Sequence, residues 1–268
     1  ILSKNLLIMK IPVYYVDAFT KKLFSGNPAA VIFSNDIDDE YLMQNIAAEN
    51  NLSETAFIRK EKNGFHIRWF APSCEIDLCG HATLASAYIY FKYIEPTATS
   101  FIVESKKNGT LGVFKKNDLL FLDFPKDNIV KDEIKDLDKI INQEILEVFR
   151  GRDDILVILN KEEDVANLNI NFEMLKQLST RGLIVSAEGK NCDFVSRSFF
   201  PATGVNEDPV TGSAHTTLTP YWSEKLNKSN LIAKQISSRG GELICEIHEN
   251  RVYIGGNAVE YMCGDIKI

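Results

Sequence analysis

Cys79-Gly80-His81-Ala82-Thr83 and Thr211-Gly212-Ser213-Ala214-His215 are two short glycine turns, one in each half of the chain, and they decide the fold. Similar segments precede them: Arg68-Trp69-Phe70-Ala71-Pro72 before the first turn and Arg197-Ser198-Phe199-Phe200-Pro201 before the second. The proline and the glycine are eight residues apart in the first copy and eleven in the second, so the second carries a three-residue insertion. The repeat predicts two related domains that each present a helix N-terminus.

Such a helix N-terminus suits an anion. Its free backbone N–H groups and the positive end of its dipole favour negative charge. We therefore hypothesise that the two termini face each other across a cleft and hold the carboxylate of a substrate.

The residues around the first turn predict an enclosed helix. No charged residue occurs from Gly80 to Phe91, and a helix that is apolar nearly all round is buried on most sides. Runs typical of strands follow at 100–104, 109–114 and 119–124. A sheet curled around a central helix is the simplest way to cover it, and we expect domains at 9–125 and 126–268. Residues 1–8, before Met9, are expected to be upstream translation or an expression remnant.

Further elements are expected along the chain. Helices are predicted from Asp38 to Glu49, from Lys131 to Phe149 with Gly151 as a stop, over 172–178, and from about Ser213, the last weakened by Pro220. Runs typical of strands are found at 13–16, 29–33, 56–58, 65–70, 155–159, 183–186, 193–200, 231–237, 242–247 and 251–254.

Composition excludes several classes of protein. The 268 residues carry a net charge of −7, which argues against nucleic-acid binding, and no apolar run approaches the roughly 20 residues that span a membrane. Five cysteines form no disulfide framework, which favours a cytoplasmic protein. Cys74, Cys79 and His81 match no common zinc spacing, so we expect no metal. Neither a phosphate-binding loop nor a dinucleotide-binding glycine motif occurs, which leaves nucleotide cofactors without support.

Four polar residues are candidates for chemistry. Most glutamates are solvated, but Glu54 precedes a strand, where partial desolvation would suit it to general acid/base catalysis. His81 at a helix N-terminus is expected to be neutral, because the dipole disfavours its protonation. Asp208 before Pro209 either starts a turn or pairs with an imidazole or a substrate amine. Ser213 is either an N-cap or a hydroxyl directed at the bound anion.

Five motifs in order resemble the phenazine-biosynthesis PhzF-like family. They are Val16-Asp17-Ala18-Phe19-Thr20, Ser25-Gly26-Asn27-Pro28-Ala29-Ala30-Val31, Leu52-Ser53-Glu54-Thr55-Ala56-Phe57, Asp77-Leu78-Cys79-Gly80-His81-Ala82-Thr83 and Glu207-Asp208-Pro209-Val210-Thr211-Gly212-Ser213-Ala214. The match extends from about Lys10 to Gly255-Gly256-Asn257-Ala258-Val259 and covers nearly the whole chain.

The resemblance implies the diaminopimelate-epimerase fold: two similar α/β domains, each a curved, mostly antiparallel sheet around a central helix, with the active site between them. It also implies a cofactor-independent isomerase, commonly a homodimer, acting on a small carboxylate-bearing substrate. Glu54 would be the acid/base, with His81, Asp208 and Ser213 as its polar partners. Cys79-Gly80 and Thr211-Gly212, with the following backbone, would bind the carboxylate.

Two alternatives stay open. In a two-thiol racemase one cysteine serves each face of the substrate; Cys79 holds the first position, but Thr211 occupies the second and has no acidic thiol. A non-catalytic ligand-binding or scaffolding protein of the same fold is the other alternative, although Glu54, His81, Asp208 and Ser213 are all present.

Overall fold

Strands dominate the computed structural model, which describes residues 9–62 and 64–268, so the expectation for residues 1–8 lies outside the described residues. The strands are β1 (Lys10–Ala18), β2 (Asn27–Phe33), β3 (Glu54–Glu61), β4 (Gly64–Phe70), β5 (Glu75–Ile76), β6 (Ser100–Ser105), β7 (Gly109–Lys116), β8 (Leu119–Pro125), β9 (Val130–Lys131), β10 (Ile145–Arg150), β11 (Asp154–Leu159), β12 (Gly182–Glu188), β13 (Phe194–Phe200), β14 (Val205–Asp208), β15 (Asn230–Gln235), β16 (Gly241–His248), β17 (Arg251–Gly256) and β18 (Ala258–Lys267). The helices are α1 (Glu40–Asn50), α2 (Gly80–Ile89), the π-helix η1 (Tyr90–Ile94), α3 (Leu137–Ile140), α4 (Glu162–Ala166), α5 (Phe172–Leu175), the 3₁₀-helix η2 (Pro201–Thr203) and α6 (His215–Leu226).

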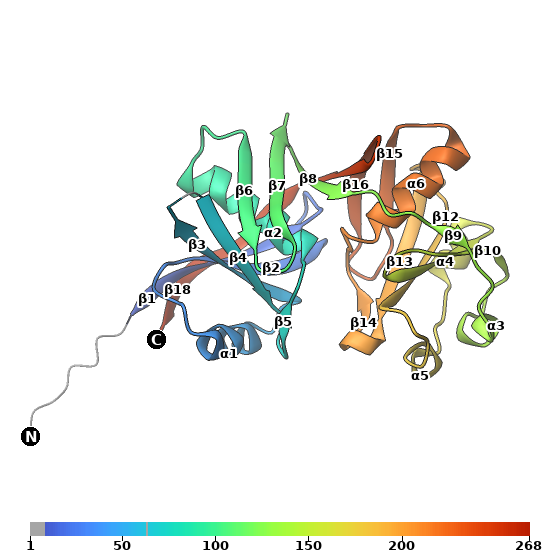
Figure 1. The fold of residues 1–268 in the computed structure, drawn as a ribbon, viewed down its shortest axis with the longest axis horizontal. Coiled ribbons are helices and arrows are strands. Elements are labelled where there is room, and N and C mark those ends of the chain that lie inside the picture. The colour runs from blue at the N-terminus through green and yellow to red at the C-terminus, as the bar shows by residue number, and fades with distance from the viewer. Residues whose placement is uncertain (1–8, 63) are drawn as a thin grey trace, which may run out of the picture.

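The two halves of the chain repeat one strand order and lie side by side (Figure 1). In the first half, β1-β2-β3-β4-β6-β7-β8 are neighbours, and β2–β3 and β4–β6 are the parallel pairs. In the second half, β10-β11-β12-β13-β15-β16-β17 follow the same order, with β11–β12 and β13–β15 parallel. The remaining neighbours in each series are antiparallel. The duplicated turn sequence is therefore matched by a duplicated, mostly antiparallel sheet.

Helix α2 lies inside the curved sheet of the first half (Figure 1). It contacts β1, β2, β3 and β8, and every residue from Gly80 to Ile89 except Tyr88 is buried. Its counterpart α6 packs on β15, β16 and β17 but keeps a polar face, since Glu224 and Lys225 are exposed. The uncharged stretch thus forms the central helix that the sequence predicted.

Strand pairing also joins the halves. β8 pairs antiparallel with β17, and the C-terminal strand β18 returns to pair with β1 along its whole length. Figure 1 shows this strand crossing back so that the C-terminus lies beside β1. Residues 258–267 therefore extend the sheet of the first half, although they lie in the second half of the chain.

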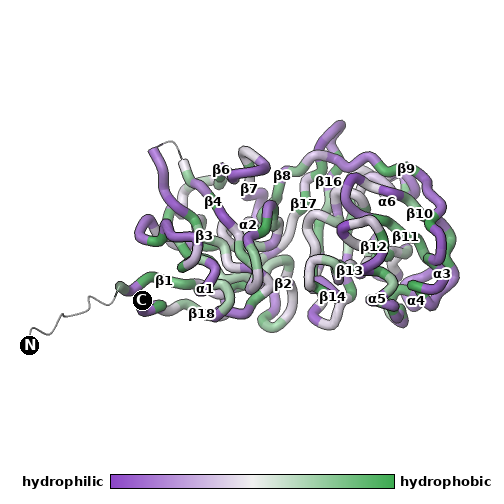
Figure 2. Tube along the Cα trace, turned by 60° about the horizontal axis from the view of Figure 1, so that its bottom comes forward, coloured by the Kyte–Doolittle hydropathy of each residue, from purple (hydrophilic) through white to green (hydrophobic). Residues whose placement is uncertain are grey.

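The predicted helix from Lys131 to Phe149 is wrong. Only α3 is helical there, and Ile145–Arg150 forms β10, which pairs with β11. In the strand order of the second half, β10 has the position that β1 has in the first half. Its pairing with β11 therefore determines the structure of residues 145–150, although their apolar residues have helical spacing. Figure 2 shows hydrophilic stretches along the outer rim near α3 and β10.

Helix α6 continues through Pro220, which was expected to weaken it. Proline has no N–H for the carbonyl one turn earlier, here that of Thr216. The Asp127 N–H donates to this carbonyl instead, at 3.2 Å. The connection between the halves therefore satisfies the carbonyl that Pro220 leaves free.

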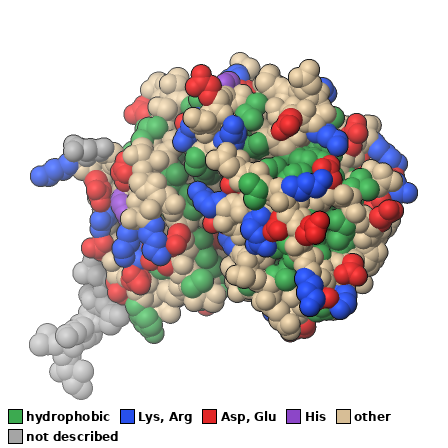
Figure 3. All heavy atoms as spheres, turned by 45° about the vertical axis from the view of Figure 1, so that its right-hand side comes forward, with side chains coloured by type: hydrophobic (Ala, Val, Ile, Leu, Met, Phe, Trp, Pro, Cys, Tyr) green, Lys and Arg blue, Asp and Glu red, His purple; other side chains and the backbone are tan. Residues whose placement is uncertain are grey.

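The surface in Figure 3 carries basic and acidic side chains interspersed with hydrophobic ones, so that face has no continuous basic area of the kind nucleic acids need. Among the described residues, no helix has the length and apolar character required to cross a membrane.

Candidate active site

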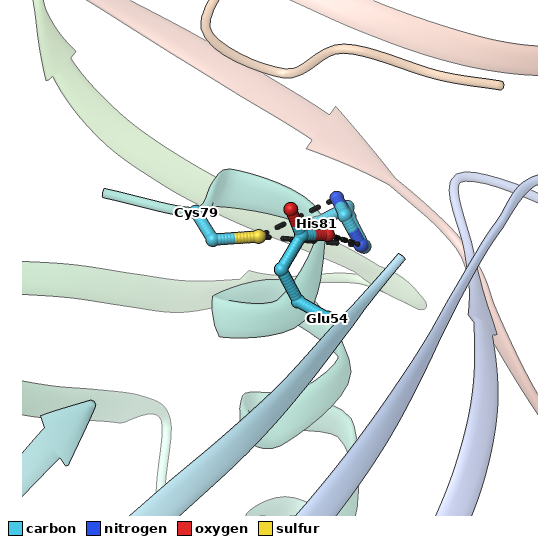
Figure 4. Close-up of side chains that lie close together, drawn as sticks. All are labelled: Glu54, Cys79 and His81. Atoms are coloured by element: carbon cyan, nitrogen blue, oxygen red, sulfur yellow. Dashed lines mark hydrogen bonds and ion pairs between the residues drawn. The ribbon is translucent and has the colours of Figure 1, made fainter. Parts of the chain in front are cut away.

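Glu54 begins β3, and the N-terminus of α2 lies beside it (Figure 4). Cys79 is the N-cap residue of α2, Gly80 its first residue and His81 its second. His81 Nε2 lies 3.1 Å from Glu54 Oε2, and the two side chains are only 6% and 15% exposed. Residues far apart in sequence therefore form a pair that is largely removed from water.

The Glu54 carboxylate is incompletely satisfied. Although His81 is at ion-pair distance, Oε2 is buried and accepts no hydrogen bond from the described residues. A buried acceptor without a donor costs about 1–3 kcal/mol, and such groups in native proteins commonly reflect function or strain. This oxygen is thus available to a ligand.

Cys79 and His81 are also in contact. The Cys79 Sγ lies 3.5 Å from Nδ1 and 4.0 Å from Nε2 of His81. Burial, and then the charge of Glu54, raise the pKa of Cys79 to about 11, so its thiol stays protonated near neutral pH. Burial alone lowers the pKa of His81, but Cys79 and Glu54 raise it well above its usual value. The direction of this pKa shift is opposite to the one expected from the helix dipole, because the neighbouring Glu54 carboxylate favours the charged imidazole.

Asp208 ends β14 on the other side of the pair. Its Oδ1 accepts a hydrogen bond from Asn27 Nδ2 at 2.8 Å, and its Oδ2 accepts one from Thr211 Oγ1 at 2.5 Å. The pKa of Asp208 is raised to about 6, because burial and the charge of Glu54 raise it by more than His81 and the two donors lower it. Asp208 is therefore a fixed carboxylate that titrates near neutrality.

Thr211 is held in turn by Gln235. The Thr211 backbone N–H donates to Gln235 Oε1 at 2.8 Å, and Gln235 Nε2 donates to the Asp208 carbonyl at 2.7 Å. The hydroxyl of Thr211 is thus directed at Asp208.

Ser213 is not the N-cap of α6, since that position belongs to Ala214. Its Oγ accepts a hydrogen bond from Arg181 Nη2 at 3.4 Å. Arg181 is anchored by Asp154, to which its Nε donates at 2.8 Å. The alternative of a capping role is therefore wrong, and the hydroxyl lies beside an anchored cation.

Gly80 and Gly212 lie against each other. A methyl group on Gly80 would be 3.7 Å from the Gly212 Cα, and one on Gly212 would be 3.8 Å from the Gly80 Cα. Among the described residues, the N–H groups of Gly212 and Ser213 donate to no backbone carbonyl, and the first N–H groups of α2 have no partner within the helix. Two sets of free donors are therefore adjacent.

One pocket of about 170 Å³ is lined by all eight residues that the sequence singled out. They are Glu54, Cys79, Gly80, His81, Asp208, Thr211, Gly212 and Ser213. Both halves of the chain contribute to it. An engineered cavity of roughly 150 Å³ holds benzene, so this pocket is the size of a single small ring.

Sequence reasoning missed two polar residues and one aromatic. Arg181 and Phe200 line the pocket, and the Arg181 guanidinium lies 5.4 Å from the Phe200 ring centroid. Asn27, buried and bonded to Asp208, was not among the candidate site residues. The motif Gly26-Asn27-Pro28 was a signal for Asn27; no motif surrounds Arg181.

The potential metal ligands differ from those considered in the sequence. Cys74 is exposed, whereas Glu54, Cys79 and His81 bring a carboxylate oxygen, a sulfur and an imidazole nitrogen within 4.8 Å of one another. The interactions above account for this grouping without an ion, and the donor types also suit a zinc-like ion.

A family of phenazine biosynthesis-like proteins, PhzF, matches residues 16–264. This chain belongs to that family. An uncharacterized isomerase of Halalkalibacterium halodurans is 44% identical, over 97% of this chain and all of its own. The crystal structure of a PhzF-family protein from Enterococcus faecalis superposes with a TM-score of 0.92 at 46% identity, covering 97% of this chain and all of that one. The resemblance to PhzF-like proteins is confirmed.

The epimerase-like fold is confirmed as well. A hydroxyproline epimerase from Agrobacterium vitis superposes with a TM-score of 0.62 over 96% of this chain and 91% of its own. At 9% identity this likeness concerns the fold alone. The isomerase names of relatives in the PhzF family support an isomerase in general.

Proposed function

We propose that this protein is a cofactor-independent isomerase that moves a carbon-bound proton in a small carboxylate-bearing molecule, with Glu54 as general acid/base. One observation carries the proposal. Glu54 Oε2 is buried without a hydrogen-bond donor in a pocket lined by both glycine turns. Such an oxygen is free to accept a proton from a bound substrate.

The substrate carboxylate would bind between the turns. The free N–H groups at Gly80-His81 and Gly212-Ser213 point positive dipole ends at the same small space. Arg181 and the Ser213 hydroxyl add a further polar wall. These groups supply an anion site from backbone and side chains present in the chain itself.

Proton transfer would then proceed through Glu54. The carboxylate takes a proton from one carbon, negative charge builds on the adjoining carboxylate or conjugated system, and the two turns stabilise that charge. The same oxygen returns the proton to another carbon. His81, 3.1 Å away, would hold the carboxylate in position throughout.

The two-thiol racemase has less support than this reaction. Cys79 is a single thiol whose pKa is raised to about 11. The matching side chain, Thr211, is already committed to Asp208. A racemase that needs an acidic thiol on each face would lack both the second thiol and an easily ionised first one.

We further propose a homodimer of two-domain protomers divided near residue 126, in a reducing compartment such as the cytoplasm. The family resemblance implies the dimer and the boundary, and the five free cysteines fit a reducing compartment. Light scattering after size exclusion tests the dimer: a monomeric mass contradicts it.

Solvent deuterium exchange tests the proposed function. The protein is incubated in D₂O with small amino acids and unsaturated cyclic carboxylates, dihydro-hydroxyanthranilate included, and C–H signals are followed by NMR. We expect exchange or double-bond migration for at least one cyclic carboxylate, undiminished by EDTA. Binding without exchange across the panel would instead favour a ligand-binding role, and activity lost in EDTA would contradict a metal-free reaction.

A further inference from the structure

Glu54, Cys79 and His81 present three different types of metal ligand at one end of the pocket (Figure 4). The Cys79 Sγ is 3.5 Å from His81 Nδ1, and Glu54 Oε2 is 3.1 Å from His81 Nε2. All three residues are held by secondary structure, at the start of β3 and of α2. The cluster is therefore built into rigid elements.

These separations are close to those of ligands that share a tetrahedral ion. With zinc–sulfur bonds of about 2.3 Å and zinc–nitrogen or zinc–oxygen bonds of about 2.0–2.1 Å, adjacent ligand atoms are roughly 3.3–3.6 Å apart. Nε2 of His81 lies 3.1 Å from Glu54 Oε2 and 4.0 Å from Cys79 Sγ, so a small movement of these side chains would place the three donors around one ion. All three residues also line the pocket.

Charge balance also permits a cation there. Two helix N-termini oppose a cation, but a Cys79 thiolate and the Glu54 carboxylate together neutralise a divalent ion. On binding, the Cys79 thiol proton and the proton on the ligating nitrogen of a charged His81 both pass to solvent, and the sulfur and that nitrogen form bonds to the metal. Glu54 Oε2, which accepts no hydrogen bond from the described residues, gains a partner.

We propose that Glu54, Cys79 and His81 form a binding site for Zn²⁺ or a similar thiophilic divalent ion, and that the bound ion blocks the pocket. The ion would engage the oxygen that the proposed reaction needs and fill the space beside Gly80. The site is inhibitory, and it goes beyond the proposed function, because the metal binds whether or not any substrate turns over.

Cobalt is the probe for this site. Co²⁺ is titrated into the protein with Cys74, Cys192 and Cys263 changed to serine, which removes the more accessible thiols. We expect one equivalent of Co²⁺ to bind, with a thiolate-to-cobalt charge-transfer band and the intense visible bands of tetrahedral cobalt. Zn²⁺ should displace it and abolish both signals.

Three variants in that background assign the ligands. Cys79→Ser should abolish the charge-transfer band, and Glu54→Gln and His81→Gln should each weaken Co²⁺ binding by at least about tenfold, as loss of a metal-supporting group typically does. His248→Gln, at a surface His–Glu pair, is the matched control and should bind as the parent does. Circular dichroism verifies that each variant is folded.

The proposal is overturned if the band is absent in the folded parent, persists in Cys79→Ser, or is unaffected by both Glu54→Gln and His81→Gln. A thermal-shift measurement distinguishes zinc binding at this site from zinc binding elsewhere. Zinc should raise the Tm of the parent but not that of Cys79→Ser. Where an exchange substrate is found, Zn²⁺ should compete with it and EDTA should restore the rate. Cobalt binding without any exchange would leave the metal site standing and remove the proposed reaction instead.

Discussion

The two glycine turns precede corresponding helices and differ in their side chains. The first turn brings a thiol and an imidazole, Cys79 and His81, against the Glu54 carboxylate. The second brings two hydroxyls, of which Thr211 is bonded to Asp208 and Ser213 to Arg181. Both glycines nevertheless lie against each other, and both turns line one pocket.

We propose that the side chains of the two turns have different tasks at the pocket. The first turn brings His81 within 3.1 Å of the buried Glu54 carboxylate, the group that we propose transfers the proton. At the second turn the carboxylate of Asp208 is already fixed by Asn27 and Thr211. We therefore expect substitutions at the first turn to affect chemistry and those at the second to affect binding and stability.

The largest expected effect is at Glu54. Glu54→Gln should reduce solvent exchange by about 10³-fold, because general acid/base catalysis typically contributes 10²–10⁴. Glu61→Gln, at the exposed far end of the same strand, is the matched control and should exchange as the wild type does. NMR with the best substrate of the panel measures both exchange rates. A decrease of less than tenfold in the exchange rate of Glu54→Gln would contradict the proposed difference between the two turns.

Asp208 should make stability depend on pH. Burial raises its pKa to about 6, whereas an unfolded Asp has a value of about 3.9, so the folded protein binds this proton more tightly. The resulting contribution is fully present below pH 4 and is lost as the pH rises through 6. It amounts to about 3 kcal/mol, at about 1.4 kcal/mol for each unit of pKa.

Urea unfolding of the wild type and Asp208→Asn between pH 4 and 8 measures this contribution. The free energy of unfolding of the wild type should fall relative to that of the variant up to about pH 7 and then level off. A difference that stays constant with pH would show that Asp208 keeps an ordinary pKa.

Thr211→Val should cost about 2 kcal/mol in the free energy of unfolding, because a hydrogen bond to a charged group contributes about 1.5–3 kcal/mol. Its hydroxyl is the donor to Asp208 Oδ2. The pKa of Asp208 should also increase in this variant, which its pH-dependent unfolding would reveal. Thr211→Ser keeps the hydroxyl and should unfold with the same pH dependence as the wild type. If Thr211→Ser is destabilised as much as Thr211→Val, loss of the hydrogen bond to Asp208 is not the cause of the destabilisation.

Ser213→Ala should have the smallest effect. Loss of one hydroxyl from the second turn should weaken carboxylate binding by about 1 kcal/mol, or about fivefold in Kd. Calorimetry measures it, with the exposed Ser73→Ala as control. An unchanged Kd would remove the Ser213 hydroxyl from the anion site and leave its backbone N–H.

Local sequence was sufficient for the central helix and for part of the pocket lining. The uncharged run from Gly80 could be placed only inside a core, and the glycine turns with their flanking motifs marked eight of the residues that line the pocket, but not Arg181 or Phe200. Helix α1 was predicted from Asp38 to Glu49, close to its observed range, with Asp39 as its N-cap. These features depend on residues that are near in sequence.

Features set by distant pairing were missed. β10 has apolar residues at helical spacing, and only its pairing with β11 makes it a strand. β18 lacks alternation because its residues from Glu260 onward are mostly exposed, and only its pairing with β1 defines it. Likewise Arg181 reaches the pocket through an ion pair with Asp154, for which no local pattern exists.

The most direct test compares Glu54→Gln with Ser213→Ala, each saturated with the same carboxylate in D₂O. NMR measures deuterium incorporation, and calorimetry sets the saturating concentration for each variant. The proposed division between the turns predicts that Glu54→Gln binds the ligand and exchanges no proton, whereas Ser213→Ala exchanges at nearly the wild-type rate once saturated. Exchange by saturated Glu54→Gln at the rate of Ser213→Ala would contradict it.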